Sequence, residues 1–582
     1  MMSHNALHLG NHALGKKPQP VFLTEEARRA HMHIIGGSGV GKSKLLEYMI
    51  RQDIQGGKGL CLIDPHGNLF DSILEFMVRY GFDKRLIVIN PAESEWSVGL
   101  NYLEHDKFIF DPGHHAENVI KGIGKAREED IFKTAGLVHW LRHLLQLLIS
   151  SGLTLMEAQL VMKINNQALR QKLLEGIVDP QLRTLLKEAW HQFETTTDRL
   201  RDEHIIFPVL NRINTFLSTQ TMRRIIGQAE SRVNFYDAMQ SGMVVLVNLS
   251  QGLTDNEKNL LGIQIIDKIY QAGAQRKPET GKQFYVYIDE FGRFVSHQLA
   301  LGLEELRKRR VSFILAHQEL EQLRDAERVG GDRLLAAVNT NTKVKVAFRI
   351  SRHDAEEMAL EVFAGKIDGS EIKHQELRTT IIPHKSRETV YAKGGSEAES
   401  QSESTLDSIS QISNQLSGMV YVPDQGWLSS DYAVSMSQST SSGLSEGRGS
   451  GRASGKSRAR SEVEIDVPFY DLEVTKEVAG TTFYSIEEIK ERFTQMLQNQ
   501  DERYFHLRIL GKSHSPIPLI TETVKPSPVL PSQMRKALEE NYRRYCLPAH
   551  EVDLQIEMRR QALLASNEVI ESERALPDVF GE

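Results

Sequence analysis

The sequence has few cysteines, no long apolar run and no excess of basic residues. Its only cysteines are Cys61 and Cys546, so neither a disulfide framework nor a Cys-x-x-Cys metal site is available. The nearest approach to a membrane-spanning run, Leu137–Ile149, is interrupted by four polar residues and is therefore predicted to be a core helix. The N-terminus lacks the basic and then apolar layout of a signal peptide. We expect a cytoplasmic protein with no integral membrane segment.

The charge and the length limit what the chain can be. The net charge of −7 excludes a protein uniformly coated in positive charge, but a basic pore or stripe for nucleic acid can sit in an acidic protein. The 582 residues are too many for one hydrophobic core, so we expect two to four structural units.

A complete phosphate-binding loop is the most specific motif in the chain. Glycines let such a backbone curl so that its N–H groups face phosphate oxygens, while the lysine reaches the β- and γ-phosphates and the hydroxyl ligates Mg²⁺. An apolar segment, Met32–Ile35, precedes the loop and a helical pattern, Ser43–Ile50, follows it, which is the order that the motif requires. The loop predicts ATP and Mg²⁺ as cofactors. Its residues are Gly36, Gly37, Ser38, Gly39, Val40, Gly41, Lys42 and Ser43.

Apolar runs bounded by polar residues predict the strands of a parallel sheet with helices between them. The fold class is therefore α/β, with a P-loop NTPase core. The core is split by an all-α insertion, because helical periodicity dominates from about Glu104 to Gly227. The predicted strands after the first are Gly59–Asp64, Leu86–Asn90, Met243–Asn248, Phe284–Ile288, Ser312–Ala316 and Lys343–Phe348.

The predicted domain organisation follows from these patterns. We expect the core to close near residue 365, so that a chain lacking residues 394 onward still folds. Scattered histidines in the N-terminal region (His4, His8, His12, His31 and His33) match no metal-ligand spacing. The predicted units are an N-terminal strand and turn segment (1–30), the ATPase core (31–103 and 228–365), the all-α insertion (104–227), a disordered Ser/Gly-rich linker (394–462), a small C-terminal α+β unit (463–530) and a helical charged tail (531–582).

Hydrolysis needs more than a phosphate cradle, and the segment FYVYIDE supplies two carboxylates. We assign Asp289 to Mg²⁺ and Glu290 to activation of the attacking water. Gln318 follows the next strand and is placed to sense the γ-phosphate. The alternative is an ordinary polar residue at a strand end, with no contact to nucleotide. Asp64, at the end of another strand, is a weaker candidate for arranging water or metal.

Positive charge must offset the negative charge that develops on the γ-phosphoryl oxygens during hydrolysis. The run Arg307–Arg310 precedes the strand Ser312–Ala316, and one of its members could reach a neighbouring subunit. Arg349, directly after the strand Lys343–Phe348, is the competing candidate. Farther on, the spaced cations between Arg448 and Arg460 fit either a nucleic-acid contact or a solvated linker.

Five segments together carry a family resemblance: GGSGVGKS, IDPHGNLF, YVYIDEFGRF, LEELRKRRVSFILAHQELEQL and VAFRISRHDAEEMA. In this order, with the helical insertion between them, they resemble the HerA/FtsK group of hexameric DNA translocases, with a RecA-like core. Within that group they look most like the conjugative coupling ATPases of type IV secretion (TraD-type). The similarity covers about residues 6–365.

The resemblance implies a homo-oligomer, a ring of six subunits with ATP at the subunit interfaces and DNA in the central pore. We expect the protein to contact the DNA backbone, with little preference for base sequence. The resemblance also ranks Arg307 above Arg349 as the arginine acting in trans. Such proteins usually begin with transmembrane helices, which are not evident here. A secretion component, a relaxase or a nuclease is a possible partner. The alternative is an ATP-switched scaffold of a secretion or anti-phage defence complex, which moves no DNA.

Overall fold

The architecture comes from a computed structural model of the chain. The structure describes residues 6–13, 19–104, 111–278, 281–324, 334–393, 420–422, 426–428, 462–511 and 516–574. These residues form two compact units, one of residues 1–369 with 485–582 and the other of residues 370–484. Each unit is described by itself.

The first unit is built on an eleven-stranded sheet of order β2-β1-β16-β15-β10-β3-β9-β8-β4-β7-β5. The seven strands from β10 to β5 are parallel to one another, whereas the four from β2 to β15 are antiparallel to their neighbours, including β15 to β10. The parallel strands are β3 (Met32–Ile35), β4 (Gly59–Asp64), β5 (Leu86–Ile89), β7 (Val244–Asn248), β8 (Phe284–Ile288), β9 (Val311–His317) and β10 (Val344–Ala347).

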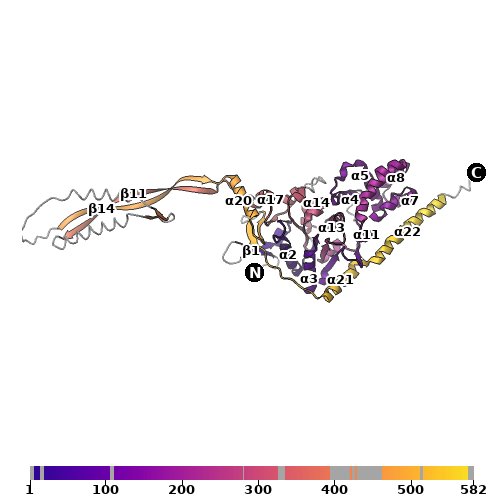
Figure 1. Ribbon diagram of the computed structural model, residues 1–582, viewed down its shortest axis with the longest axis horizontal. Helices are drawn as coiled ribbons and strands as arrows, with labels where there is room; N and C mark the ends of the chain where they lie inside the picture. The colour runs from indigo at the N-terminus through magenta and orange to yellow at the C-terminus, as the bar shows by residue number, and fades with distance from the viewer. Residues whose placement is uncertain are drawn as a thin grey trace, which may run out of the picture. The chain divides into compact units, whose positions relative to one another are not determined.

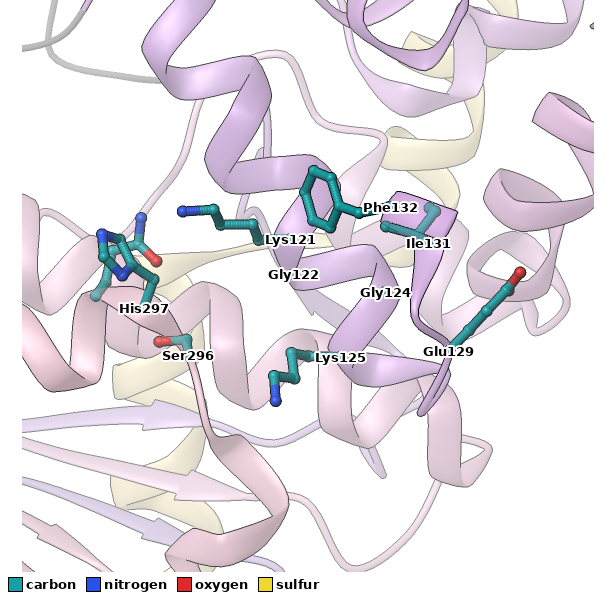
Figure 2. Close-up of a pocket in the computed structure, with 10 residues that line it drawn as sticks. Lys121, Gly122, Gly124, Lys125, Glu129, Ile131, Phe132, Ser296 and His297 are labelled. Atoms are coloured by element: carbon teal, nitrogen blue, oxygen red, sulfur yellow. The ribbon is translucent and has the colours of Figure 1, made fainter. Parts of the chain in front are cut away.

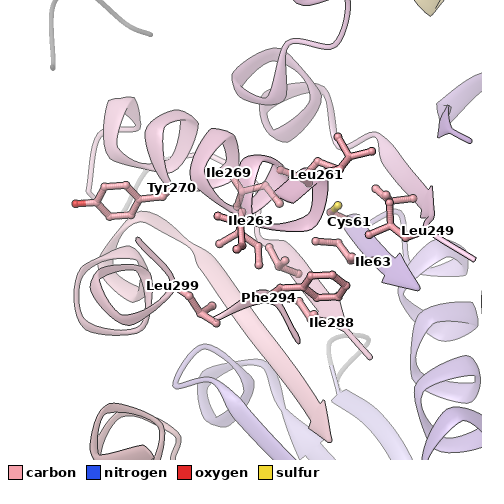
Figure 3. Close-up of a cluster of buried hydrophobic side chains, with 14 of the residues drawn as sticks. Cys61, Ile63, Leu249, Leu261, Ile263, Ile269, Tyr270, Ile288, Phe294 and Leu299 are labelled. Carbon is pink, nitrogen blue, oxygen red and sulfur yellow. The ribbon is translucent and has the colours of Figure 1, made fainter. Parts of the chain in front are cut away.

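Every residue of these seven parallel strands is buried, which is why they are continuous apolar runs in the sequence. The predicted strands and the α/β class are confirmed. Helix α13 (Asp255–Gln275) packs its apolar residues over β4 and β8, where Leu261 and Ile263 gather with Cys61, Ile288 and Phe294 (Figure 3). The helices associated with the parallel strands are α2 (Lys42–Gln55), α3 (Asn68–Arg79), α12 (Phe235–Ser241), α13 (Asp255–Gln275), α14 (His297–Glu305), α16 (Leu334–Asn341) and α17 (Arg352–Phe363).

The region between β6 (Trp96–Val98) and α12 contains helices and no strand among its described residues. Local signals account for several helix starts: Thr154 and Glu157 form the predicted capping box, and Asp179 caps the helix that begins at Pro180. The α-helices are α4 (Pro112–Ala126), α5 (Ala135–Ser150), α6 (Ala158–Val161), α7 (Gln167–Glu175), α8 (Pro180–Thr195), α9 (Asp198–Arg201), α10 (Phe207–Asn214) and α11 (Gln220–Ile226).

The four antiparallel strands come from the two ends of the chain: β1 (Ala6–His12), β2 (Pro20–Thr24), β15 (Tyr504–Ile509) and β16 (Ile517–Ile520). The expectation that the core closes near residue 365 is wrong, because β15 pairs with β10 and extends the sheet. Consequently β15 and β16 do not belong to a separate small α+β unit. The pairing partner of an edge strand is chosen by tertiary packing, and no local pattern reveals it.

The second unit is a two-stranded antiparallel ribbon of β11 (Ile372–Lys393) and β14 (Glu462–Phe483). Its strands form the long pair of arrows in Figure 1. Two short strands, β12 (Val420–Val422) and β13 (Gly426–Leu428), pair with each other. Most of the predicted linker 394–462 and the cations between Arg448 and Arg460 lie outside the described residues.

After the ribbon the chain continues in the first unit. Helix α20 (Ile486–Gln498) begins at the predicted capping box of Ser485 and Glu488. Beyond β16 follow α21 (Pro531–Tyr545), β17 (Cys546–Pro548), which pairs with β6, and α22 (Ala549–Arg574), which runs beside α7 and α11 (Figure 1). Within the described ranges, no helix is both long enough and apolar enough to cross a membrane.

Candidate functional site

The loop Gly36–Gly41 joins the carboxyl end of β3 to the start of α2. Two of its positions require glycine. A Cβ on Gly36 would lie 2.6 Å from the Cβ of Phe348, and Gly41 has a φ of +113°. The loop thus wraps tightly over the end of β10, where Phe348 follows the strand.

Backbone donors of this loop face no acceptor in the described part of the chain. The N–H groups of Ser38, Gly39, Val40 and Gly41 make no hydrogen bond to protein there. Lys42 Nζ donates to the carbonyl oxygens of Gly36 at 2.5 Å and of Gly37 at 2.7 Å, so the ammonium group lies across the loop. A row of unpaired N–H groups beside an ammonium at a helix N-terminus fits a polyphosphate.

Two carboxylates at the end of β8 lie beside this cradle. The Ser43 hydroxyl donates to Asp289 Oδ2 at 3.2 Å, which places the two predicted Mg²⁺ ligands together. Burial raises the pKa of Asp289 to about 6, and repulsion from Asp64 adds to the rise. Burial lowers the pKa of Lys42, while Asp289 and Glu290 oppose that effect. A hydroxyl and a crowded carboxylate are oxygen ligands suited to Mg²⁺.

Glu290 adopts a left-handed conformation with a φ of +48°, which non-glycine residues seldom do. Its Oε1 accepts hydrogen bonds from Gln318 Nε2 and lies 2.9 Å from His66 Nε2, and its Oε2 lies 3.4 Å from Arg293 Nε. Groups from three elements therefore fix this buried carboxylate at the mouth of the site. The structure brings Gln318 into contact with Glu290, while the assignment of Gln318 to the γ-phosphate stays a prediction.

His66 and Arg293 were missed by sequence reasoning. His66 lies in the turn after β4, and Arg293 comes three residues after Glu290. Their only sequence signal is that each follows the end of a parallel strand, which is a weak indication of a functional residue. Asp64, the weaker candidate for arranging water or metal, binds backbone groups of the next turn. Its two carboxylate oxygens accept the N–H groups of His66 and Phe70, each at 2.8 Å, and so hold the turn that starts α3.

The two candidate arginines lie at opposite edges of the sheet. Arg349 follows β10, its carbonyl oxygen accepts the N–H of Gly37 at 2.9 Å, and it lines the same hollow as Gly37 and Ser38. Arg307 instead precedes the parallel strand β9, whose seven residues span about 23 Å. Its side chain is exposed and makes no hydrogen bond or ion pair within the described residues. Arg307 cannot reach the loop of its own chain.

The hollow beside the phosphate loop is lined in part by residues from the C-terminal part of the sequence. Gln498 and Asn499, at the end of α20, line it together with Val40, Gln318 and Arg349. No local pattern in the sequence marks these two residues, because their role depends on the return of the chain after the ribbon.

Several of the scattered N-terminal histidines have protein partners. His31 Nδ1 accepts the N–H of Phe313 at 2.9 Å. His8 Nδ1 lies 2.7 Å from the Tyr48 hydroxyl, and His33 Nε2 lies 2.6 Å from His317 Nε2. Burial lowers the pKa of both His33 and His317, so this pair is neutral near pH 7.

A separate hollow lies between α4 and α14 (Figure 2). Lys121 and Lys125, one turn apart on α4, extend toward the start of α14, where Ser296 and His297 lie. None of the predicted site residues lines this hollow, so it is distinct from the phosphate loop.

Comparison with solved structures gives distant matches. A bacterial conjugative coupling protein, TrwBdeltaN70, is 14% identical, with 88% of this chain and 89% of that chain covered and a TM-score of 0.44. Plasmid coupling protein TrwB in complex with ADP and Mg²⁺ is 16% identical over 58% and 75% of the two chains, with a TM-score of 0.40. VirB4 of Thermoanaerobacter pseudethanolicus is 14% identical over 61% and 87%, with a TM-score of 0.38.

Among curated proteins, an uncharacterized protein of Mycoplasma pneumoniae is 36% identical over 83 residues. That match covers 14% of this chain and about half (53%) of the length of the relative. The family model described as "Type IV secretion-system coupling protein DNA-binding domain" matches residues 19–426, which is well over half of the 582 residues. The chain therefore belongs to the family of type IV secretion-system coupling protein DNA-binding domains.

Proposed function

We propose that this protein is an ATP-driven, ring-shaped DNA translocase that moves DNA through a central pore during conjugative transfer or the processing of a mobile element. The observation that carries the proposal is the convergence of Lys42, Ser43, Asp289, Glu290 and Gln318 at one edge of the sheet. Membership of a coupling-protein family supports DNA as the substrate.

Each residue has a role in the proposed hydrolysis. The loop N–H groups and Lys42 would bind the phosphates of ATP. Ser43 and Asp289 would hold Mg²⁺, which would neutralise the negative charge that develops on the phosphate. Glu290 accepts the proton of the attacking water, and Gln318 reports the γ-phosphate to the end of β9. The structure supports this division through the short separation of Ser43 from Asp289 and the contact of Gln318 with Glu290.

Arg307 is proposed to complete the site of a neighbouring subunit. Its exposure and its position at the edge opposite its own phosphate loop support a role in trans. Arg349 is retained as a contact within the same chain, because it lines the hollow beside its own loop. An arginine supplied across an interface can be worth on the order of 10³-fold or more in turnover.

The test of translocation chemistry is ATP hydrolysis with and without DNA. We expect DNA to stimulate turnover, and DNA affinity to fall by about 10³-fold or more between 50 and 200 mM salt, because phosphate contacts dominate. Affinity should depend little on base sequence. ATP turnover that ignores DNA would instead favour the ATP-switched scaffold.

The test of the trans arrangement mixes Arg307→Ala subunits with Lys42→Ala subunits. Each variant alone should be inactive, and mixed rings should regain partial activity, because some interfaces pair an intact loop with an intact arginine. Lys308→Ala, which removes the exposed neighbour of Arg307, is the matched control and should keep activity alone. If mixed rings form without recovery, the same mixture with Arg349→Ala tests the other candidate.

A further inference from the structure

The segment that follows the ribbon returns to the phosphate loop. Helix α20 ends at Gln498 and β15 begins at Tyr504, so the connection between them is short. Its last residue, Arg503, donates its backbone N–H to the carbonyl oxygen of Val40 at 2.9 Å. One turn of this C-terminal connection is thus fastened to the apex of the loop.

The side chain of Arg503 lies over the last glycine of the loop. A Cβ on Gly41 would be 3.4 Å from the Cα and 3.7 Å from the Cγ of Arg503, so the arginine stem is in van der Waals reach of that position. Arg503 Nη2 donates to the carbonyl oxygen of Thr521 at 2.6 Å, which fixes the direction of the side chain. The residue is exposed and adopts a φ of +70°, an unusual conformation for arginine.

This arrangement leaves N–H groups of the Arg503 guanidinium, beside the phosphate loop, without a protein acceptor among the described residues. A guanidinium has five N–H groups in a rigid fork, and one of them serves Thr521. In the described part of the chain, Nε and Nη1 of Arg503 have no hydrogen-bond partner. Gly41 directly precedes Lys42, and its own N–H also lacks a protein acceptor there. A cation held at this point adjoins the α- and β-phosphates that such a loop binds.

We propose that Arg503 is a further nucleotide-binding residue, which contacts the α- or β-phosphate of the bound nucleotide from the C-terminal return of the same chain. The inference rests on the proposed ATPase function and adds a residue from outside the segment matched by the family model. It makes nucleotide affinity depend on correct docking of the segment that follows the ribbon.

The informative variant is Arg503→Gly. Glycine keeps the backbone N–H that binds Val40 and accepts a positive φ without strain, so the thermal midpoint should stay the same or rise. The side chain is lost, with its hydrogen bond to Thr521, while the backbone hydrogen bonds are kept. We expect the dissociation constants of ATPγS and of ADP, measured by isothermal titration calorimetry on the full chain, to rise alike by about tenfold or more. Arg503→Lys, which keeps the charge, should recover part of the affinity.

The matched control is Glu128→Gly, which replaces another exposed residue of positive φ, in the connection after α4. It should leave both dissociation constants unchanged. Wild-type affinity in Arg503→Gly would overturn the proposal, as would a loss confined to ATPγS, because the contact would then concern the γ-phosphate. A loss of affinity accompanied by a lower thermal midpoint and not eased by lysine would also overturn it, since Arg503 would then serve only to support the fold.

The Lys42→Ala variant distinguishes failure of the Arg503 assignment from failure of the proposed ATPase function. If Lys42→Ala abolishes binding while Arg503→Gly does not weaken it, only the assignment of Arg503 is wrong. If Lys42→Ala binds ATPγS as tightly as the wild type, the phosphate loop does not bind nucleotide and both proposals fall.

Discussion

The parallel and antiparallel parts of the sheet differ in how they are specified and in what they carry. The seven parallel strands are continuous buried runs, and their carboxyl edge gathers the buried groups Lys42, Asp289 and Glu290. The four antiparallel strands come from both ends of the chain and contribute mainly backbone pairing, with β15 along β10 and Arg503 on Val40. The candidate catalytic groups lie in the parallel part, and the antiparallel part adds a hydrogen bond to the phosphate loop.

The largest effect is expected from removal of the C-terminal strands of the antiparallel part. A chain ending at Gly369 lacks β15 and β16 together with α20, α21 and α22, so β10 keeps only β3 as a neighbour and the buried Phe505, Leu507 and Leu519 are absent. We expect no soluble, cooperatively folded protein, as judged by size-exclusion chromatography and calorimetric unfolding.

The matched deletion removes residues 372–483 and keeps the strands that follow. The backbone N–H of Tyr484 donates to the carbonyl oxygen of Glu371 at 3.0 Å, so a short glycine linker can join the two sides. This chain should fold with a thermal midpoint within a few degrees of the full chain. Folding of the chain that ends at Gly369 would show that the parallel part is self-sufficient.

Lys42→Ala tests the chemistry of the parallel part. It removes the ammonium that lies across the loop, and no other residue of the motif can replace it, so ATP hydrolysis should be abolished while the protein remains folded. Phosphate release is the measurement. Lys44→Ala, which removes an exposed lysine paired with Glu47, should keep full activity. Comparable turnover in both variants would contradict the role of the loop.

Glu290→Gln separates binding from hydrolysis. Ser43 and Asp289 remain, so ATP affinity should be unchanged, whereas turnover should fall by about 10²- to 10⁴-fold through loss of the base. Single-turnover hydrolysis and nucleotide binding should be measured together. Glu188→Gln, an exposed carboxylate in α8, is the control. Loss of ATP binding in Glu290→Gln would mean that Glu290 and Asp289 share the metal.

In the antiparallel part, His506 of β15 should make a smaller contribution to the free energy of unfolding, and this contribution should depend on pH. Burial lowers its pKa from 6.5 to about 4, with a further contribution from Lys366. As the pH falls, the unfolded chain takes up the proton first, so stability present above pH 6.5 is lost toward pH 4, by roughly 3 kcal/mol in total. His506→Gln should therefore lose less free energy of unfolding than the wild type between pH 7 and pH 5.

Denaturant unfolding at several pH values measures this difference. Other buried histidines, including His31, also have a lowered pKa, so both proteins should weaken in acid. The prediction concerns the gap between the two curves. Parallel curves would show that His506 does not titrate differently in the folded and unfolded chains.

The sequence by itself determined the phosphate loop, the α/β class, the parallel strands and several helix starts. These features are local: a buried strand is a contiguous apolar run, and a capping box such as Ser485 with Glu488 lies within four residues. The order of Asp289 and Glu290 after β8 is equally local, because the carboxyl ends of parallel strands share one edge of the sheet.

Only the tertiary structure decided which strands complete the sheet and which side chains surround the candidate catalytic groups. The pairing of β15 with β10 joins segments separated by the whole ribbon, and the contact of His66 with Glu290 and of Arg503 with Val40 depends on loops that meet in space. An edge strand can pair with any exposed edge, so its sequence does not name its partner. The placement of Arg307 at the opposite edge from its own loop likewise follows from strand direction in the folded sheet.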